Sequence, residues 1–577
     1  MKITKIKIQN FRGLDIECDG LDDKTLFIGQ NDSGKSNICS AILKVFTLEK
    51  RRKPLISSDS TFCNNLDIEL SFQLSLDNLN VQQLGLLQDW FYYDENQKLY
   101  MDVWMICKYN TDTMQYEDEL RFGKRDGDCS IIPINNQNKL DKVLSVVYIN
   151  PTYDLANEKK NYFSYKEIKK VENQQALGQS IQNTIADLQN AVKEETIFQD
   201  VISDLNDLGD FGLIFDGMKF ELSPNIKVES IFNSLDILNF NNNGNQIDYI
   251  GDGKSKVLSM ILKAKTIDNN KCKIFIVEEP ENHLYVLLQK YYLSALLSLS
   301  PHQLIITTHS PFIVDFEKIN KIYKIAKAYD NDGVLSNFVY SFNINNNDFK
   351  EFGYLINTEI AEMIYYDTVV LLEGYSEKYF YNLLSIKDNR FFKYLSKHKI
   401  GLYSIGNIAF EKTKQLLESL GIKVYIKTDN DVTKVKNSEK YRYTGLKRVY
   451  KYLNTESKEK FLKIISVDNE EALLDALTCD DNEMVIELLE EKMDDLIDLC
   501  IKNNILLSKH HDGFEKDFLD YILIEEPQYT LDFKYLKSDK LKNLHEYIMD
   551  SDVDITINNQ NKKSILLGFV NIDEIFE

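Results

Sequence analysis

Residues 29–36, with the sequence GQNDSGKS, have the pattern of a phosphate-binding loop. They fit GxxxxGK[ST] and stand between an apolar strand-like segment and a helix-like segment. Glycines let backbone N–H groups close around phosphates, and the start of the next helix adds a positive dipole. We therefore predict that Lys35 contacts the β- and γ-phosphates and that Ser36 ligates Mg²⁺. The other predicted nucleotide contacts in this loop are Asn31, Ser33 and Gly34.

A second segment, IFIVEEPENHL, offers carboxylates to the same nucleotide. Glu278 and Glu279 end an apolar strand, and buried carboxylates are costly unless they are paired or bind a metal. We expect Glu278 to hold the Mg²⁺–water shell and Glu279 to polarise an attacking water. His309 follows the next apolar strand, where it would contact a γ-phosphate. A solitary histidine is more often structural, but the three surrounding elements favour a functional role here.

A separate set of carboxylates lies further along the chain. Glu373 ends an apolar strand in LLEGYSEKYF, and Glu377 follows one helical turn later, so both face the same point. Asp429 and Asp431 end the strand in YIKTDNDV, with side chains on the same side. Carboxylate oxygens suit Mg²⁺ or Mn²⁺, and two such ions can clamp a phosphodiester during displacement. One D-x-D alone would indicate only a solvated strand end; the two motifs together favour a metal site.

The elements that position these residues alternate between strands and helices. Apolar strands at 273–280 and 303–311, separated by a helical segment, predict a largely parallel sheet covered by helices. The polar, helical segment 155–235 predicts an inserted arm or dimerisation element. A loop at 340–360 marks the boundary between two α/β domains, which we place at 1–345 and 346–577. In the second domain, strands at 368–380, 401–407 and 423–432 have acidic residues near their ends.

Composition excludes several classes of protein. At 577 residues the chain exceeds one hydrophobic core, and 43% hydrophobic and 27% charged residues are ordinary for a soluble protein. The eight cysteines are scattered without a CxxC pair, which argues against a zinc ribbon and fits a reducing cytoplasm. No apolar run is long enough to cross a bilayer. We therefore expect a cytoplasmic protein without a membrane partner.

The net charge of −22 opposes general coating of nucleic acid, which needs a basic surface. One segment is nevertheless basic: residues 434–463 contain ten Lys or Arg against three Glu, with tyrosines at 441, 443, 450 and 452. A charge run of this kind is commonly a solvated helix face. Because it begins three residues after Asp431, a phosphate-binding strip beside the metal site is the alternative interpretation.

Taken together, the nucleotide motifs resemble those of ABC-type ATPase heads in the group that contains SMC, RecF and the OLD nucleases. By this resemblance residues 30–36 are Walker A, Glu278 and Glu279 are Walker B and the catalytic glutamate, and His309 is the switch histidine. Residues 251–255 (GDGKS) resemble a reduced signature loop, which implies head-to-head dimers. Glu278 replaces the usual Asp, and the signature lacks LSGGQ, so the resemblance implies slow or absent turnover with nucleotide binding retained.

The second acidic site resembles the Toprim fold of topoisomerases, DnaG primases and OLD-family nucleases. This resemblance implies that Glu373 is a general acid/base or metal residue and that Glu377, Asp429 and Asp431 are metal ligands. Gly406-Asn407 stands where the family often has paired glycines. OLD nucleases also have late acidic and lysine elements. The candidates for these are Glu515 and Asp517, for a second metal ion, and Lys540, for transition-state charge.

The order of these parts resembles the OLD family over nearly the whole chain, and local segments such as LLEGYSEK and YLKSDKL resemble the nuclease subunits of Gabija anti-phage systems. The resemblance implies a metal-dependent DNA endonuclease restrained by ATP, assembled as a homodimer to homotetramer, with a UvrD-like helicase partner. Two alternatives stay open: an ATP-dependent repair or switch scaffold that binds DNA without cutting, and an OLD-type nuclease acting on RNA. A topoisomerase would need a tyrosine on a further domain, for which the chain has no room.

Overall fold

The computed structural model describes residues 1–150, 252–344 and 357–508, with short gaps, and a few residues between 183 and 247. The predicted insertion at 155–235 lies outside the described residues, apart from isolated positions, as do Gly406, Asn407, Glu515, Asp517 and Lys540. Within the described part, no helix is long and apolar enough to cross a membrane. All eight cysteines are described, and they are free thiols.

The chain divides into two compact units. One contains Met1–Thr25 and Gly34–Ile313, and the other contains Leu26–Ser33 and Val314–Glu577. The second unit thus includes the strand that precedes the phosphate-binding loop. The domain boundary that we placed after residue 345 stays a prediction.

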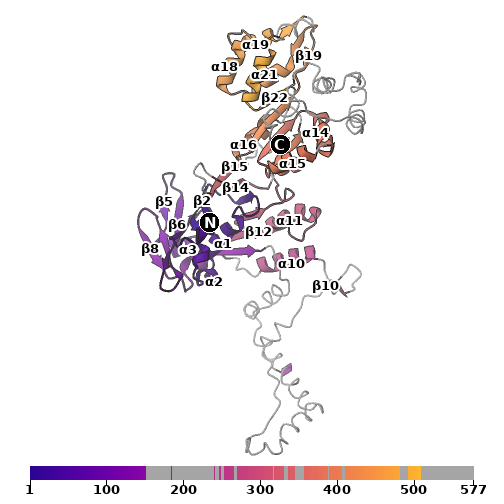
Figure 1. Ribbon diagram of the computed structural model, residues 1–577. Helices are drawn as coiled ribbons and strands as arrows, with labels where there is room; N and C mark the ends of the chain where they lie inside the picture. The colour runs from indigo at the N-terminus through magenta and orange to yellow at the C-terminus, as the bar shows by residue number, and fades with distance from the viewer. Residues whose placement is uncertain are drawn as a thin grey trace, which may run out of the picture. The chain divides into compact units, whose positions relative to one another are not determined.

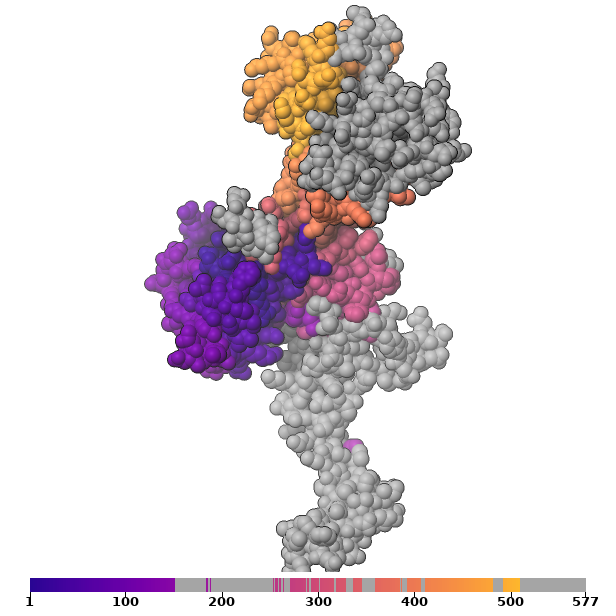
Figure 2. All heavy atoms as spheres, in the orientation of Figure 1, coloured from indigo at the N-terminus to yellow at the C-terminus, as the bar shows by residue number. Residues whose placement is uncertain are grey.

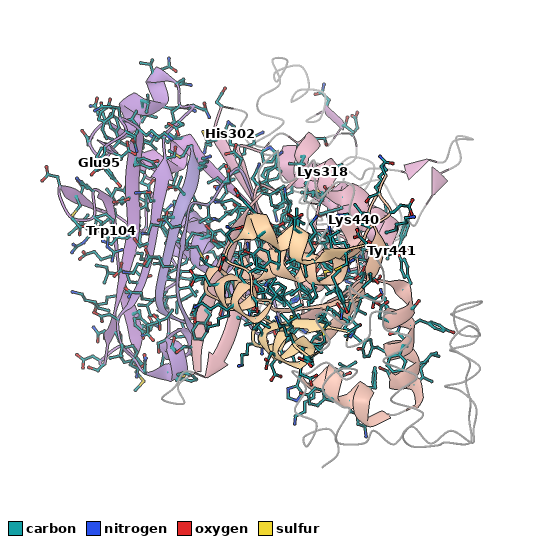
Figure 3. The ribbon with its side chains drawn as sticks, turned by 90° about the horizontal axis from the view of Figure 1, so that it is seen from above. Glu95, Trp104, His302, Lys318, Lys440 and Tyr441 are labelled. Atoms are coloured by element: carbon teal, nitrogen blue, oxygen red, sulfur yellow. The ribbon has the colours of Figure 1, made fainter. Side chains whose placement is uncertain are left out.

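The first unit contains a seven-stranded sheet with antiparallel neighbours, in the order β2-β1-β4-β6-β7-β8, with β5 paired to β6 (Figure 1). Its strands are β1 (Lys2–Phe11), β2 (Leu14–Asp19), β4 (Ile68–Ser75), β5 (Tyr92–Tyr93), β6 (Leu99–Asn110), β7 (Gln115–Gly123) and β8 (Cys129–Ile132). Along β2, buried and exposed residues alternate strictly, as expected for a strand with one face in the core. Trp104 of β6 is buried in this sheet, and its side chain is labelled in Figure 3. In the space-filling view, most of the indigo and purple atoms, which belong to the first 150 residues, gather in one lobe (Figure 2).

A six-stranded sheet has the order β15-β14-β3-β13-β12-β9. Its strands are β3 (Lys24–Gly29), β9 (Leu144–Ile149), β12 (Cys272–Glu278), β13 (Gln303–Thr308), β14 (Lys321–Tyr329) and β15 (Leu335–Asn343). Strand β12 runs parallel to both β9 and β13, which confirms the parallel arrangement predicted for the strands at 273–280 and 303–311. Every residue of β13 is buried, as expected for a parallel strand covered on both faces.

Helices and short elements complete this part of the chain. The longer helices are α1 (Lys35–Phe46), α10 (Asp252–Lys265) and α11 (Val286–Ser298). The shorter elements are α2 (Leu48–Arg51), η1 (Ser57–Asp59), η2 (Thr61–Cys63), α3 (Val81–Leu87), α4 (Lys139–Val143), β10 (Asn239–Phe240) and β11 (Gln246–Ile247).

A four-stranded parallel sheet, in the order β17-β16-β18-β22, lies in the second unit. Its strands are β16 (Thr368–Leu372), β17 (Ile400–Ser404), β18 (Lys423–Thr428) and β22 (Ile505–Leu507), and the helices of this region are α13 (Asn357–Met363), α14 (Tyr375–Lys387), α15 (Asn389–Lys397) and α16 (Phe410–Ser419). Because all strand pairs are parallel, their carboxyl ends meet at one edge. Ligand sites of open parallel sheets form at this edge.

Between β18 and β22 the chain builds a small subdomain around its own core. Its elements are β19 (Val432–Lys434), β20 (Tyr441–Tyr443), β21 (Thr478–Cys479), α17 (Thr444–Tyr452), α18 (Thr455–Ile464), α19 (Glu470–Ala476) and α21 (Met493–Lys502). Helices α18, α19 and α21 lie together beside β22, at the orange-to-yellow end of the ribbon in Figure 1.

The basic segment 434–463 belongs to this subdomain, and its four tyrosines are part of the core or pack against it. Tyr443 and Tyr450 are buried in the core cluster, and Tyr441 and Tyr452 pack against it. Burying an aromatic ring contributes strongly to a small core, which explains this use of the tyrosines. The proposed phosphate-binding strip therefore consists of lysines and arginines, without exposed tyrosine rings to stack on bases.

Candidate functional sites

The phosphate-binding loop needs glycine at two positions. Gly29 has φ +156°, and a Cβ there would overlap the carbonyl oxygen of Ile325. Gly34 has φ +104°, and a Cβ there would overlap the side chain of Leu14. Both the backbone conformation and the close packing exclude a larger residue. The loop thus takes its shape from the two glycines of the sequence motif.

Helix α1 begins directly at Lys35, with Gly34 as its N-cap and no side-chain cap. A helix start of this kind is suited to binding an anion. The Lys35 and Ser33 side chains are buried, whereas Asn31 and Ser36 are exposed. The helix start thus follows the glycine loop directly in the chain, as the phosphate-binding motif requires.

Glu278 and Glu279 occupy different environments at the end of β12. Glu278 is buried, and the hydroxyl of Tyr148 on the neighbouring strand β9 donates a hydrogen bond to its Oε2. Burial, and then this bond, raise the pKa of Tyr148, so the phenol stays a proton donor. Tyr148 was not predicted as a site residue, because it is 130 residues away from Glu278 in the sequence. The two meet only through the pairing of β9 with β12.

Glu279 and His309 lie side by side, just after the ends of the paired strands β12 and β13. The His309 Nε2 atom is 3.3 Å from the Glu279 Oε1 atom. The Asn282 side-chain amide donates to the Glu279 Oε2 atom over 2.9 Å, and the backbone N–H of His309 donates to Glu281 over 2.6 Å. The Glu279 backbone has φ +42° and donates to the Thr307 carbonyl over 2.9 Å. A positive φ at a non-glycine residue is a strained conformation found frequently at functional sites.

Lys256, which the motif search missed, holds the loop that follows Glu279. It lies in α10, one residue after the GDGKS segment, and only 2% of its surface is exposed. Its Nζ donates to the carbonyls of Glu279, Pro280 and Asn282 over 3.3, 3.1 and 2.8 Å. Burial lowers its pKa to about 8, against the opposing effect of nearby Glu281. A lysine signal next to the signature-like segment was present in the sequence, but its partners were not visible there.

The second acidic site lies at the carboxyl edge of the four-stranded sheet. Glu373 directly follows β16, and its Oε2 accepts hydrogen bonds from the Thr428 hydroxyl and the Asp429 backbone N–H, over 2.8 and 3.0 Å. The end of strand β18 thus holds the carboxylate of the residue that follows β16. Glu377 is buried in the first turn of α14, with its carboxylate against Gly374, where a Cβ would come within 2.7 Å of Glu377 Oε2.

Three residues that the sequence analysis did not single out, Ser508, Lys427 and Arg448, complete this edge. The Ser508 hydroxyl, just after β22, donates to Asp429 Oδ1 over 3.3 Å, and the buried Lys427 donates to the same hydroxyl over 3.2 Å. Arg448, on α17, donates to Glu373 Oε2 through Nη1 and to Asp431 Oδ2 through Nη2, the latter over 3.1 Å. Arg448 was included only in the basic segment, since no motif marks it.

The structure therefore places Glu373, Asp429 and Asp431 at one edge of the sheet, where Glu373 is bonded to the Asp429 backbone and, through Arg448, to Asp431. Glu377 lies one helical turn further along the chain. Among the described residues, no three His, Cys, Asp or Glu side chains converge in an arrangement that could hold a metal ion. The arginine lies between two of the expected ligands instead. The assignment of these four carboxylates as metal ligands stays a prediction, and so do the roles of Glu515, Asp517 and Lys540.

Comparison with known families matches both halves of the chain. The model described as "AAA ATPase domain" matches residues 1–175 and 135–314, and that described as "Overcoming lysogenization defect protein-like, TOPRIM domain" matches residues 364–431. The Toprim match spans β16 to Asp431, and so includes Glu373, Glu377 and Asp429. The two matches together support the two-part architecture of ATPase head and Toprim domain.

A curated relative, Endonuclease GajA from Bacillus cereus (strain VD045), is 25% identical over 479 residues, covering 79% of this chain and 80% of the relative. Similar solved structures include the SMC head domain from Thermotoga maritima, with 16% identity, a TM-score of 0.29 and coverage of 59% of this chain and 98% of that chain. An Smc head domain derived from Pyrococcus furiosus matches with 16% identity, a TM-score of 0.34 and coverage of 61% and 98%. Because the ATPase model matches residues 1–314, more than half of the chain, the chain belongs to the family described as "AAA ATPase domain", and it joins this ATPase domain to an OLD-like Toprim domain.

Proposed function

We propose that this protein is a metal-dependent DNA endonuclease whose Toprim carboxylates cut phosphodiester bonds under the control of a nucleotide bound in the ATPase domain. The observation that supports it most is the meeting of Glu373, Asp429 and Asp431 at the carboxyl edge of a parallel sheet. The similarity to Endonuclease GajA supports the same activity.

The donor set at this edge fits Mg²⁺ or Mn²⁺. Carboxylate and hydroxyl oxygens are the ligands that these hard cations prefer. The guanidinium of Arg448, within hydrogen-bond distance of Glu373 and Asp431, is a stand-in cation and indicates that the position favours positive charge. Glu373, Asp429 and Asp431, with Glu377 behind them, would hold the ions. When bound, such ions supply an activated water and neutralise charge on the phosphate that is cut.

The chain's own residues keep the carboxylates aimed at the substrate edge. Thr428 and the Asp429 N–H orient Glu373, and Ser508 orients Asp429. Lysines and arginines of segment 434–463, many of them exposed, would contact DNA phosphates and position the duplex without reading its sequence. These contacts thus hold the Glu373 and Asp429 carboxylates at the edge of the sheet.

One contact supports control by nucleotide. Gln30, in the phosphate-binding loop, donates through Nε2 to the Asp367 carboxylate, over 3.3 Å to Oδ1 and 3.5 Å to Oδ2. Asp367 is the residue before β16, and Glu373 is the residue after it. If nucleotide binding changes the conformation of the loop, the change would act on Asp367 at the start of β16. Glu373, the proposed catalytic carboxylate, follows the end of the same strand. We propose that bound ATP restrains cutting through this strand.

The test is cleavage of a supercoiled plasmid with Mg²⁺ or Mn²⁺, with and without ATP, by the wild type, Lys35→Ala and Glu373→Ala. We expect Glu373→Ala to abolish cutting, ATP to inhibit the wild type, and Lys35→Ala to cut equally with and without ATP. Equal cutting by wild type and Glu373→Ala would refute the nuclease proposal. Stimulation by ATP would refute only the regulatory part. An RNA substrate in the same panel decides between the two nucleic acids.

The wider biological setting is part of the same proposal. By its relationship to GajA, we propose an anti-phage role in the cytoplasm, assembly as a homodimer or homotetramer, and partnership with a UvrD-like helicase subunit. Size-exclusion chromatography with light scattering measures the oligomer. Phage plating on cells with and without the gene, with Glu373→Ala as control, measures the defence.

A further inference from the structure

The Toprim carboxylates are paired with a cation that belongs to the chain. Arg448 donates through Nη1 to Glu373 Oε2 and to the Thr428 hydroxyl, the latter over 2.7 Å, and its Nη2 is 3.1 Å from Asp431 Oδ2. The guanidinium side chain is only 12% exposed, and those of Glu373 and Asp431 are 16% and 33% exposed. This is a partly buried three-residue ion cluster and not a surface ion pair.

The backbone of α17 is built to bring Arg448 to this position. The N–H groups of Thr444 and Gly445 donate to the Asp431 carbonyl, over 2.8 and 3.1 Å. A Cβ on Gly445 would overlap the backbone of Asp429, Asn430 and Asp431, so only glycine allows this approach. Arg448 follows Gly445 by three residues and therefore lies on the same helix face. The helix start rests on the loop that holds the two aspartates.

Core packing prevents α17 from turning away. Leu446 and Val449 are fully buried, and Tyr450 is 6% exposed, all in the subdomain core. These residues set the rotation of the helix, and that rotation directs Arg448 at the carboxylates. The arginine position is thus determined by both the loop and the core.

We propose that Arg448 is an internal competitor for the metal, so that a divalent ion reaches Glu373 and Asp431 only when the guanidinium leaves them. Arginine keeps its charge at all ordinary pH values, so the competition cannot be relieved by deprotonation. A guanidinium and a divalent ion at the same carboxylates compete, because they draw on the same negative charge and the two cations repel each other. Arg448 thereby raises the metal concentration at which the site fills. This inference rests on the proposed function, since it concerns the same carboxylates.

Metal affinity measured without DNA and without nucleotide tests the proposal. Mn²⁺ binding to the full chain is titrated calorimetrically for the wild type, Arg448→Gln and Arg448→Lys, with Glu373→Gln to identify which binding event belongs to this site. We expect Arg448→Gln to lower the Mn²⁺ Kd about tenfold or more, equivalent to at least about 1.4 kcal/mol. Arg448→Lys keeps the charge, and we expect its Mn²⁺ Kd to lie between those of the wild type and Arg448→Gln.

Arg442→Gln is the matched control. Arg442 belongs to the same basic segment, on β20, and donates to Thr478 over 2.8 Å. We expect its Mn²⁺ Kd to equal that of the wild type. An unchanged or weaker Mn²⁺ affinity in Arg448→Gln would overturn the proposal and make Arg448 a support for the carboxylates.

A second measurement needs no substitution and so survives misfolding of a variant. Phenylglyoxal labels accessible guanidinium groups, and mass spectrometry locates the label. Mn²⁺ should increase labelling of Arg448 in the wild type and leave Arg442 unchanged; no increase at Arg448 contradicts the competition. Neither measurement involves cleavage. If the protein cuts no nucleic acid, the proposed function is refuted, whereas the metal titration and the labelling still decide whether Arg448 competes with the metal.

Discussion

At the scale of single residues, the two candidate sites each contain a buried or partly buried cation, but its partners differ. In the ATPase site, Lys256 is a buried cation surrounded by carbonyl oxygens, close to Glu279 and Glu281 without an ion pair to either in the described contacts. In the Toprim site, Arg448 is held by two carboxylates. Lysine can lose its proton at moderately alkaline pH when it is buried, whereas arginine cannot. The two cations therefore predict different responses to pH.

The response of Lys256 is a test of its burial. Its folded-state pKa, about 8, is below the ordinary lysine value of 10.5, so the folded protein releases the proton first. Between these pH values the unfolded chain binds more protons, and the Lys256 contribution to stability rises with pH; below about 8 the burial penalty is fully present. We expect the free energy of unfolding of wild type minus that of Lys256→Met to increase from pH 7.5 to 10. Urea unfolding of both proteins at several pH values measures it, and a constant difference would contradict the shift.

The phosphate-binding loop gives a second prediction at this scale. Replacing Lys35 with Ala removes a charge-assisted contact to phosphate, and such contacts contribute roughly 1.5–3 kcal/mol. We expect ATP affinity to fall by about ten- to a hundredfold in Lys35→Ala. Glu279→Gln, which keeps the Asn282 neighbour and side-chain size, should bind ATP with affinity close to wild type. Fluorescent-nucleotide titration distinguishes them, and equal affinities of wild type and Lys35→Ala would refute the assignment of the loop.

At the scale of elements, the close approach of α17 to the Asp429–Asp431 loop is the feature that arranges the Toprim edge. The approach depends on a glycine with no special φ, whose only requirement is space. A helix start that moved away from this loop would withdraw Arg448 from Glu373. The geometry of the site is therefore sensitive to one methyl group outside it.

Gly445→Ala tests this sensitivity. The added Cβ would overlap three backbone positions, which cannot shift as a flexible side chain would. We expect a loss of stability of about 1–3 kcal/mol, as for overpacked cores, together with reduced plasmid cutting. Gly85→Ala is the control, because Gly85 lies in α3 and its Cβ would meet no atom within 4 Å. That variant should gain roughly 0.5–1 kcal/mol from helix propensity, measured by urea unfolding. A Gly445→Ala protein as stable as wild type would show that the loop yields easily.

At the scale of the whole molecule, the question is how a nucleotide influences a carboxylate in a different domain. The route through Gln30, Asp367 and β16 lies within one compact unit, since residues 26–33 group with residues after 313. Two further contacts hold the residues just before β16. Lys324 of β14 donates to the Tyr366 carbonyl over 2.8 Å, and the Lys399 Nζ atom is 3.7 Å from the Asp367 carboxylate. The strand start is thus tied to the ATPase sheet at more than one point.

Breaking the first contact should separate nucleotide binding from regulation. We expect Gln30→Ala and Asp367→Ala to bind ATP within about threefold of wild type and to lose most of the inhibition of plasmid cutting by ATP. Both changes remove the Gln30–Asp367 hydrogen bond, and Asp367→Ala also removes the ion pair with Lys399. The double variant should therefore match Asp367→Ala and not show the sum of the two effects. Undiminished inhibition in both single variants would exclude this route. Lys399→Gln, which removes only the neighbouring ion pair, serves as the comparison.

Local sequence determined the parts of this protein that depend on neighbours along the chain. The phosphate-binding loop, the strand ends with Glu278, Glu373 and Asp429, and the alternation of strand and helix could be predicted because a glycine conformation, an apolar period or a strand end is encoded within a few residues. The family followed from the order of these motifs, and both family matches support it.

Only the tertiary structure decided which distant side chains meet. Tyr148 reaches Glu278 through strand pairing across 130 positions, and Arg448 reaches Glu373 across 75 positions. The four tyrosines of segment 434–463 stood in a segment interpreted as a solvated helix face or a phosphate-binding strip, but two of them are buried in the core and the other two pack against it. The reason is physical: a side chain's partner depends on the register of sheets and the rotation of helices. Long-range packing determines both, and no local pattern of residue types records them.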